Sequence, residues 1–374
     1  MRVTITVGGK WYALQLAEQL EKQGLLHRVV TSHPHWAFQS PGISPRKIVS
    51  FPLAEAVGQG INRLTRSSAG DYWKGVLFDR FALTQVSDGD VLVGFASFCR
   101  TTLARKQGLR GRVVERACPH ILQQIQMGRE EADLLGLRCY NDPRITERML
   151  KEYDLADLIV VPSRYSQNSF LARGFSREKV RIVPLSGKFP GPVQPPERDP
   201  RAPFRLLFVG GSFLRKGLIY LLRAWHSLRL ENAELILRSS DCPSTPEVRK
   251  LLDDPSVHLL KQSQDLSRLY SEVSAFCLPS VDDGFGMVVL EAMAYGLPVI
   301  VTENVGAADC VREGTDGFIV KIRNVEALKE KILDLYEHPE KRQGMGESAR
   351  QRAGAFTWEI YGKNYAQALR PFAG

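Results

Sequence analysis

Apolar and polar positions follow two different periods along this chain. Short apolar runs, typical of buried strands, are separated by longer segments in which apolar residues recur at helical spacing. In the first half, the helical pattern is clearest at 11–23, and strand-like runs lie at 2–7, 27–32, 90–95, 111–116, 156–163 and 180–185. Strands that alternate with helices in this way indicate βαβ units, and therefore a parallel sheet covered by helices.

A proline-rich segment interrupts the alternation at residues 187–203. Its sequence, GKFPGPVQPPERDPRAP, can continue neither a helix nor a strand, so it is predicted to link two domains. The alternation restarts at 204–210 and continues to 325–338. We therefore predict an α/β fold with two Rossmann-like, doubly wound domains, residues 1–190 and 204–355, that face each other across a cleft. Ligands of such sheets bind beyond the carboxyl ends of the strands.

The composition is that of an ordinary soluble protein with a substantial core, because 44% of the 374 residues are hydrophobic and 24% are charged. The formal charge of +9 favours anionic partners, but no RNA-binding motif accompanies it, so nucleic acid is not an expected partner. No segment is apolar over the about 18 residues of a membrane span, and MRVTITVGG reaches a diglycine before a signal-peptide core forms. We expect a cytoplasmic protein.

The cysteines give no sign of a disulfide framework or of a metal site. They show neither a CxxC pair nor a Cys/His ligand spacing, and we interpret them as reduced and mostly buried: Cys99, Cys118, Cys139, Cys242, Cys277 and Cys310. Asp282 and Asp283 are adjacent acids, but no third ligand stands at a suitable spacing. Neither a metal nor a cofactor is therefore predicted.

Two glycine-containing turns follow predicted strands and could bind an anion. Gly8 and Gly9 end the first strand, where their amides could approach a phosphate, although a plain strand-to-helix turn explains them equally well. The segment VGGSFLRKG follows the first strand of the second domain and carries Arg215 and Lys216. These cations stand where an anionic ligand is expected, or they form a solvated basic pair at a turn.

The segment DDGFGMVVLE, residues 282–291, combines a turn, a helix start and an acid in an apolar helix. The predicted helix begins near Gly286, and its free amides would favour an anion. Asp282 or Asp283 could cap that helix. A cap does not explain Glu291, whose carboxylate is costly among apolar neighbours unless it has a partner. Hydroxyl groups of a sugar or a ribose are suitable partners.

At this D-x7-E pattern the chain resembles the family 4 glycosyltransferases, which are retaining enzymes with the two-domain GT-B fold and an E-x7-E signature. The similarity covers nearly the whole chain: it includes VGGSFLRKG, LPSVDDGFGMVVLEAMAYGLPVIVT, VPSRYSQNSFLARGFSREKVRIVP, ENVGAADCVREGTDGFIV and FTWEIYGKNYAQAL. The resemblance implies that residues 356–374 form a helix that crosses back to the first domain.

For the second domain, the resemblance implies a donor site. Glu291 would bind the ribose hydroxyls, Asp283 would lie near the donor sugar, and Lys216, helped by Arg215, would neutralise the diphosphate. The amides around Phe285, Gly286, Met287 and Val288 would meet sugar and phosphate oxygens. The chain departs from the family at Asp283, which is shorter than the usual Glu by roughly 1.5 Å, and at Gly211, where the family often carries an Arg. The segment VPLSGK also replaces the commoner VPNGV.

For the first domain, the resemblance implies that His120, in the segment ERACPH, contacts the donor sugar and that Gly8 and Gly9 line the acceptor side of the cleft. Without this resemblance, His120 would be interpreted as structural, because a lone histidine after a proline more often is. The basic run 99–112 could touch anionic lipid headgroups or a phosphorylated glycan, or could be the solvated face of a helix.

The function implied is transfer of a hexosyl unit, with retention, from a nucleotide diphosphate sugar to a hydroxyl acceptor that is a glycan, a glycolipid or a small molecule. The leaving phosphate would help to deprotonate the acceptor, and closure of the two domains would bring their residues together. Two alternatives stay open: a nucleotide-sugar epimerase of the same fold, and a non-catalytic scaffold that binds sugar nucleotides.

Overall fold

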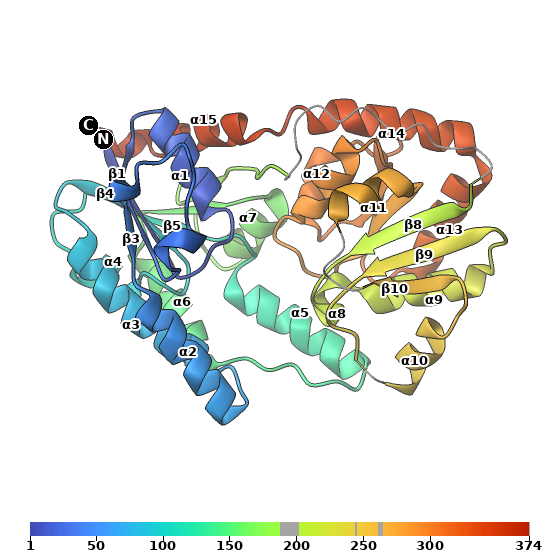
Figure 1. Ribbon diagram of the computed structural model, residues 1–374, viewed down its shortest axis with the longest axis horizontal. Coiled ribbons are helices and arrows are strands. Elements are labelled where there is room, and N and C mark those ends of the chain that lie inside the picture. The colour runs from blue at the N-terminus through green and yellow to red at the C-terminus, as the bar shows by residue number, and fades with distance from the viewer. Residues whose placement is uncertain (188–201, 244, 261–264, 374) are drawn as a thin grey trace.

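The computed structural model describes residues 1–187, 202–243, 245–260 and 265–373, and these form two α/β domains (Figure 1). The linker predicted at 187–203 lies almost entirely outside the described residues. In the first domain the seven-stranded sheet has the order β3-β2-β1-β4-β5-β6-β7. Its strands are β1 (Arg2–Val7), β2 (Leu26–Thr31), β3 (Ile48–Ser50), β4 (Asp90–Phe95), β5 (Gly111–Glu115), β6 (Leu158–Val161) and β7 (Val180–Ile182).

The six-stranded sheet of the second domain has the order β10-β9-β8-β11-β12-β13. Its strands are β8 (Phe204–Val209), β9 (Ala233–Arg238), β10 (Val257–Leu260), β11 (Ala275–Leu278), β12 (Val299–Thr302) and β13 (Gly317–Val320). Every pairing in both sheets is parallel. Both sheets therefore have the doubly wound order, and the predicted fold class is confirmed.

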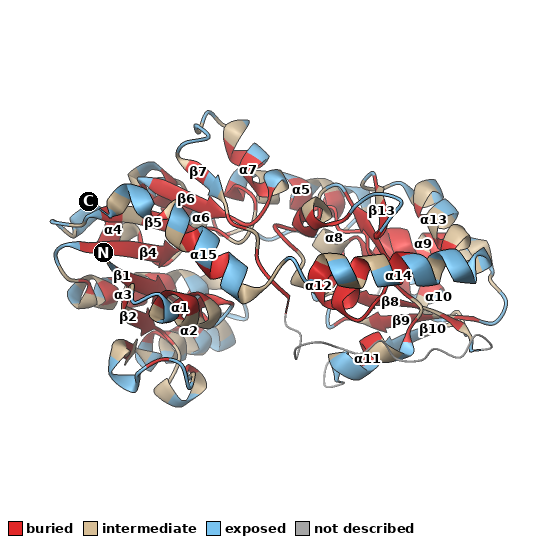
Figure 2. Cartoon of the chain, turned by 90° about the horizontal axis from the view of Figure 1, so that it is seen from above, coloured by how far each residue is buried: buried red, intermediate tan, exposed pale blue. Residues whose placement is uncertain are grey.

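Helices cover both faces of the two sheets, so the inner strands are buried almost throughout, whereas the edge strand β10 is not (Figure 2). The first domain contains α1 (Ala13–Lys22), α2 (Pro52–Thr65), α3 (Ala69–Gln85), α4 (Arg100–Arg105), α5 (Ile121–Leu134), α6 (Pro143–Leu155) and α7 (Arg164–Leu171). The second contains α8 (Phe213–Lys216), α9 (Leu218–Leu228), α10 (Pro246–Leu252), α11 (Leu266–Glu272), α12 (Met287–Ala294), α13 (Val325–Glu337) and α14 (Pro339–Ala353).

Helices α15 and α5 are among the elements that connect the described parts of the two domains. After α14 has run along the second domain, α15 (Trp358–Ala368) packs on α1 of the first (Figure 1). Helix α5 begins in the first domain but packs against α8, and its buried Glu131 accepts hydrogen bonds from Tyr220, at 2.9 Å, and from Arg323. Sequence patterning assigned α5 to the first domain alone, because the partners of its last turns are far away in sequence.

Two further findings bear on the sequence-based expectations. In the described part of the chain no helix is both long and apolar enough to cross a membrane. All six cysteines lie in that part and are free thiols; Cys99, Cys277 and Cys310 are buried, whereas Cys139 is exposed. Burial of the cysteines is thus less general than predicted.

Candidate active site

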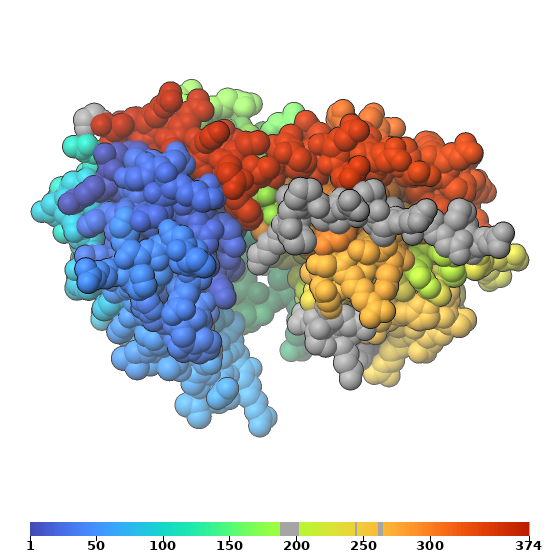
Figure 3. All heavy atoms as spheres, turned by 45° about the horizontal axis from the view of Figure 1, so that its top comes forward, coloured from blue at the N-terminus to red at the C-terminus, as the bar shows by residue number. Residues whose placement is uncertain are grey.

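The candidate residues gather where each sheet changes the direction of its strand order. In the first sheet this point lies between β1 and β4, and in the second between β8 and β11. The segments that follow these strands carry Gly8, the pair Arg215 and Lys216 on α8, and the pair Asp282 and Asp283. A doubly wound sheet opens a crevice there, and the surface is hollowed between the two domains (Figure 3).

Both cations of α8 are paired with the two adjacent acids. Lys216 Nζ contacts Asp283 Oδ2, and Arg215 Nε donates to Asp282 Oδ2 at 3.3 Å. Burial lowers the pKa of Arg215, but the nearby Cys118 thiol and the carboxylates of Asp282 and Asp283 outweigh it, so the net shift is upward. The structure therefore brings Arg215, Lys216 and Asp283 together, as the resemblance implied, in a charge-balanced cluster.

Asp282 has a role that the sequence did not reveal. Its side chain is fully buried, and its Oδ1 accepts a hydrogen bond from the hydroxyl of Tyr165, on α7 of the first domain, at 2.9 Å. Neither acid caps α12, because the N-cap residue is Gly286 and it makes no side-chain cap bond. The expectation of an aspartate cap was wrong: both carboxylates bond to cations from α8 instead.

The amino end of α12 is open toward the site. Gly286 has a φ of 81°, a left-handed conformation that a side chain rarely adopts. Gly286, Met287 and Val288 are half-buried, and the first amides of a helix have no partner within it. Phe285 differs, because its ring is buried in the core and only its backbone is available to a ligand. This end of α12 can accept an anion beside Lys216.

Glu291 lies one turn further along α12 and is buried, as its apolar neighbours predicted. Its Oε2 accepts a hydrogen bond from Tyr270, on α11, at 3.2 Å. Burial, together with the charge of Glu291, raises the pKa of Tyr270 well above its usual value, so the hydroxyl stays a donor. The acid thus has a protein partner, and its predicted contact with a ribose stays a prediction.

The two domains touch at Gly284. A Cβ atom at this position would lie 2.0 Å from the carbonyl oxygen of Ala117 and 2.6 Å from Cα of Cys118, so only glycine fits. The carbonyl of Gly284 accepts hydrogen bonds from the hydroxyls of Ser163, at 2.8 Å, and Ser166, at 3.2 Å. The middle of ERACPH, Ala117 and Cys118, therefore lies directly against the D-x7-E turn.

His120 is placed differently from the other candidates. Its side chain is 2% exposed and lies among Tyr153, Phe170 and Phe175, with ring centroids 4.9–5.9 Å away. Its Nδ1 accepts the amide of Leu122 as the cap of α5. Burial, with nearby Arg173 and Arg116, lowers the pKa of His120 to about 3. These contacts are those of a structural histidine, and contact with a donor sugar stays a prediction.

The three candidate glycines lie at the carboxyl ends of their strands. Gly8 and Gly9 follow β1 and are buried, and Gly211 follows β8 and is exposed. A Cβ at Gly211 would meet only the Ser240 hydroxyl, at 3.5 Å, so this position is open. That Arg215 of α8 replaces the guanidinium that the family often carries there stays a prediction.

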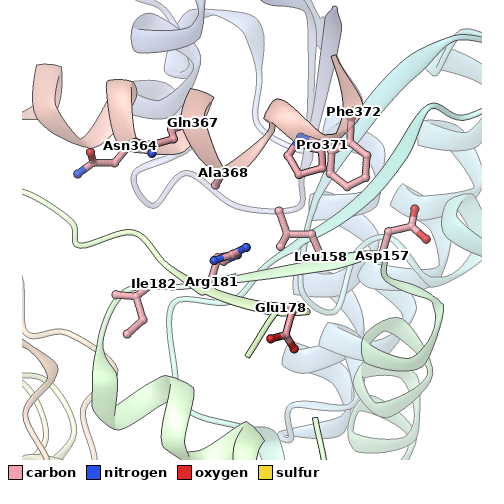
Figure 4. A pocket seen from close by; sticks show the side chains of 10 residues that line it. All are labelled: Asp157, Leu158, Glu178, Arg181, Ile182, Asn364, Gln367, Ala368, Pro371 and Phe372. Carbon is pink, nitrogen blue, oxygen red and sulfur yellow. The ribbon is translucent and has the colours of Figure 1, made fainter. Parts of the chain in front are cut away.

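A surface pocket elsewhere shares no residue with this set (Figure 4). It lies between the terminal segment that includes α15 and η4 (Arg370–Phe372) and the strands β6 and β7, and its polar lining includes Asp157, Glu178 and Arg181. No candidate residue points into it.

Part of the chain is similar to known proteins. Residues 203–338 match the family model described as "Glycosyl transferases group 1". An uncharacterized glycosyltransferase of Haemophilus influenzae is 30% identical over 151 residues, which cover 39% of this chain and 43% of that protein. The chain spans less than half the length of the first curated relatives that it matches. Residues 203–338 are thus similar to glycosyltransferases, as the resemblance implied. The activity of the whole chain, the family 4 subtype and the retaining mode stay predictions.

Solved structures define the fold further. The chain aligns with sucrose-phosphate synthase from Thermosynechococcus elongatus with a TM-score of 0.70 and 20% identity over 99% of each chain. It aligns with Anabaena HepE in complex with UDP-glucose with a TM-score of 0.67 and 15% identity, over 99% of this chain and 100% of that one. The chain has the GT-B fold of these proteins.

Proposed function

We propose that this protein transfers a hexosyl unit from a nucleotide diphosphate sugar to a hydroxyl acceptor, with retention at the anomeric carbon. The observation that carries the proposal is the pairing of Lys216 and Arg215 with Asp283 and Asp282 beside the open amino end of α12. The nucleotide sugar seen with Anabaena HepE supports a donor of the same chemical class here.

The diphosphate would bind between α8 and α12. In the structure Lys216 is held by Asp283, so an arriving diphosphate exchanges one anionic partner of the lysine for another. Asp283 is then released to accept hydrogen bonds from the hydroxyls of the donor sugar. Arg215 keeps its bond to Asp282 and adds a fixed positive charge. Positive charge fixed before reaction favours the diphosphate as its charge grows during bond cleavage.

Retention follows in this proposal from attack on the same face that the diphosphate leaves. The oxygen of the leaving phosphate, held by Lys216 and the amides of α12, accepts the proton of the acceptor hydroxyl. The carbon–oxygen bond to the phosphate breaks, and a bond to the acceptor oxygen forms on that face. Glu291 would bind the ribose, and this contact would keep the diphosphate next to the cations of α8.

The location proposed for the protein is the cytoplasm, where its thiols stay reduced, with contact to an anionic membrane surface through the run 99–112. Part of that run is already neutralised, because Lys106 lies 2.8 Å from Asp88 and Arg112 lies 3.9 Å from Asp157. Arg105 and Arg110 are exposed and supply the remaining charge.

The test is a screen of uridine, guanosine and adenosine diphosphate sugars, first by thermal shift and then by turnover. A selective ligand raises the melting temperature by mass action. Release of nucleoside diphosphate with a glycosylated acceptor of unchanged anomeric configuration supports the proposal. A new sugar epimer without transfer would identify an epimerase, and binding without any turnover would identify a scaffold; either result contradicts the proposal.

A further inference from the structure

The pocket of Figure 4 lies between the terminal helix and the edge of the first sheet. Helices α15 and η4 form one wall, and the edge strand β7 with the start of β6 forms the other. Its volume is about 600 Å³, within the range of about 300–1,000 Å³ for small-molecule sites, so about two sugar rings fit. Asp157 and Leu158 stand at the amino end of β6, whereas the donor crevice lies beyond the carboxyl ends of the strands. The pocket is therefore separate from the donor site.

The polar side chains of this pocket share one property, because each ends in a planar polar group. They are Asp157, Glu178, Arg181, Asn364 and Gln367. A carboxylate accepts hydrogen bonds, a guanidinium donates them, and a carboxamide does both. Neighbouring hydroxyls of a sugar ring also donate and accept, so this mixture of groups matches them.

Three of these groups are available to a ligand. Arg181 is exposed and forms no ion pair with any residue that the structure describes. Asn364 and Gln367 are exposed as well, and their carboxamides form no hydrogen bond within the described ranges. The two carboxamides are three residues apart on α15, which places them on one side of the helix. A ligand can bond to all three side chains without breaking an existing contact.

The charges of the lining nearly cancel. Asp157 Oδ2 accepts the amide of Arg112 at 2.8 Å and lies 3.9 Å from its guanidinium. Glu178 opposes Arg181 on the other side of the pocket floor, and its own backbone amide and the Ser176 hydroxyl lower its pKa, so it stays an ionised acceptor. With each acid matched by an arginine, the lining favours an uncharged ligand over a phosphate or a carboxylate.

An aromatic ring completes the pocket. Phe372 is half-buried, and a Cβ at Gly111 would lie 2.5 Å from its ring, so the ring is held against the backbone at the start of β5. Pro371 and Ala368 flank it on the same wall. A fixed aromatic ring with apolar neighbours can pack against the C–H face of a sugar ring, while the planar polar groups meet its hydroxyls.

We propose that this pocket is a binding site for a neutral saccharide. One ring of the saccharide lies against Phe372 and Pro371, and its hydroxyls bond to Arg181, Asn364 and Gln367. Binding here involves no residue of the donor site and does not require the proposed function. Its use, to keep a glycan acceptor on the protein between transfers, rests on that function.

The test measures binding in the absence of a donor. Maltose, cellobiose and N,N′-diacetylchitobiose are titrated into the full chain by calorimetry, beside glucuronate and phenylalanine. We expect at least one disaccharide to bind with a Kd of about 5 mM or lower, about threefold or more tightly than the two charged compounds. No binding of any disaccharide overturns the proposal. Tighter binding of glucuronate, or of the zwitterion phenylalanine, would show that the charges of Arg181 and Glu178 select the ligand, and also overturns it.

Hydrogen exchange locates the bound saccharide. Amides of residues 178–182 and 364–372 should exchange more slowly when the disaccharide that binds is present. Protection confined to other parts of the chain contradicts the assignment to this pocket.

Two variants test the polar groups, both at exposed positions where no effect on folding is expected. Arg181→Gln is expected to weaken binding of the disaccharide about threefold to tenfold, and Asn364→Ala about twofold to fivefold. Arg370→Gln and Lys363→Ala are the matched controls, because these exposed residues are close in sequence to the pocket but do not line it. Unchanged affinity in both test variants contradicts the site.

The two proposals fail separately. A wild-type protein that binds the disaccharide at this pocket but never releases nucleoside diphosphate contradicts the proposed function and leaves the saccharide site. A wild-type protein that uses a donor but binds no disaccharide here contradicts the saccharide site alone.

Discussion

The hydroxyl of Tyr165 and the carboxylate of Asp282 meet between the two domains, with the oxygen atoms 2.9 Å apart. The same carboxylate accepts Arg215, so a residue of the first domain is joined through one buried acid to a cation of the donor site. Burial, followed by the charge of Asp282, raises the pKa of Tyr165 above its usual value, and the hydroxyl remains a donor at ordinary pH. Asp282 therefore acts as a positioning residue for Arg215.

The first prediction concerns Asp282→Asn, which keeps the shape of the side chain and removes its charge. Arg215 then loses its ionic partner and its fixed orientation, and we expect kcat to fall about tenfold to a hundredfold while KM for the donor changes little. Steady-state kinetics measures the two constants. Asp133→Asn, at an exposed position of α5, is the control. A change confined to KM would show that Asp282 acts in substrate binding and not in positioning Arg215.

Tyr165→Phe tests the other half of the same relationship. Removal of the hydroxyl leaves one oxygen of a buried carboxylate without its donor, which costs about 1–3 kcal/mol. Denaturant unfolding should show that loss, and Tyr140→Phe, at an exposed position, should not. Equal stability of the two variants would show that the contact contributes nothing to holding the domains together.

Lys216→Ala is expected to lower kcat about a hundredfold to a thousandfold, since it removes one preorganised charge from the leaving group. It also leaves Asp283 without the lysine, so affinity for the diphosphate should fall as well. Lys250→Ala, on the exposed side of α10, provides the control. Turnover by Lys216→Ala at the wild-type rate would exclude a role for this lysine in departure of the diphosphate.

The sequence was sufficient for the features that depend on local patterns. The parallel sheets and the position of the glycine turns follow from βαβ alternation, and Glu291 was identified because a carboxylate stood in an apolar helix. It was not sufficient for contacts between distant segments. The residues near Asp282 in the sequence do not predict its contacts with Tyr165 and Arg215. Those near His120 do not predict the aromatic side chains that bury it.

The stability of the protein should depend on pH through Glu115, at the end of β5. Its two oxygens accept the hydroxyls of Tyr12, at 2.6 Å, and of Tyr365 on α15, at 2.7 Å. Burial raises the pKa of Glu115 to about 7, and the two hydroxyls offset this only in part. The pKa of Glu115 is therefore higher in the folded protein than in the unfolded chain. The stabilisation that protonated Glu115 gives the fold is fully present below about pH 4.5 and is lost as the pH rises through about 7.

The measurable consequence is a fall in unfolding free energy of up to about 3 kcal/mol between pH 4.5 and 7.5 from this group. Glu115→Gln cannot ionise, so denaturant unfolding of this variant should lack that part of the pH dependence. Glu18→Gln, at a half-buried position of α1, controls for loss of a carboxylate. Identical pH profiles for the wild type and Glu115→Gln would contradict the raised pKa.

The assignment of Glu291 to the ribose gives the sharpest prediction for the donor site. A buried carboxylate that accepts a ribose hydroxyl contributes about 1.5–3 kcal/mol for each hydrogen bond, so Glu291→Ala should weaken nucleoside diphosphate binding at least about tenfold. The wild type should also bind a 2′-deoxynucleoside diphosphate more weakly than the ribonucleotide, and Glu291→Ala should lose that discrimination. Calorimetry measures all four affinities. Glu272→Ala, on α11, removes an exposed acid from the neighbouring helix and should leave both affinities unchanged. If Glu291→Ala still bound the ribonucleotide more tightly than the deoxynucleotide, another group would bind the ribose hydroxyl. Glu291 would then serve only to position Tyr270.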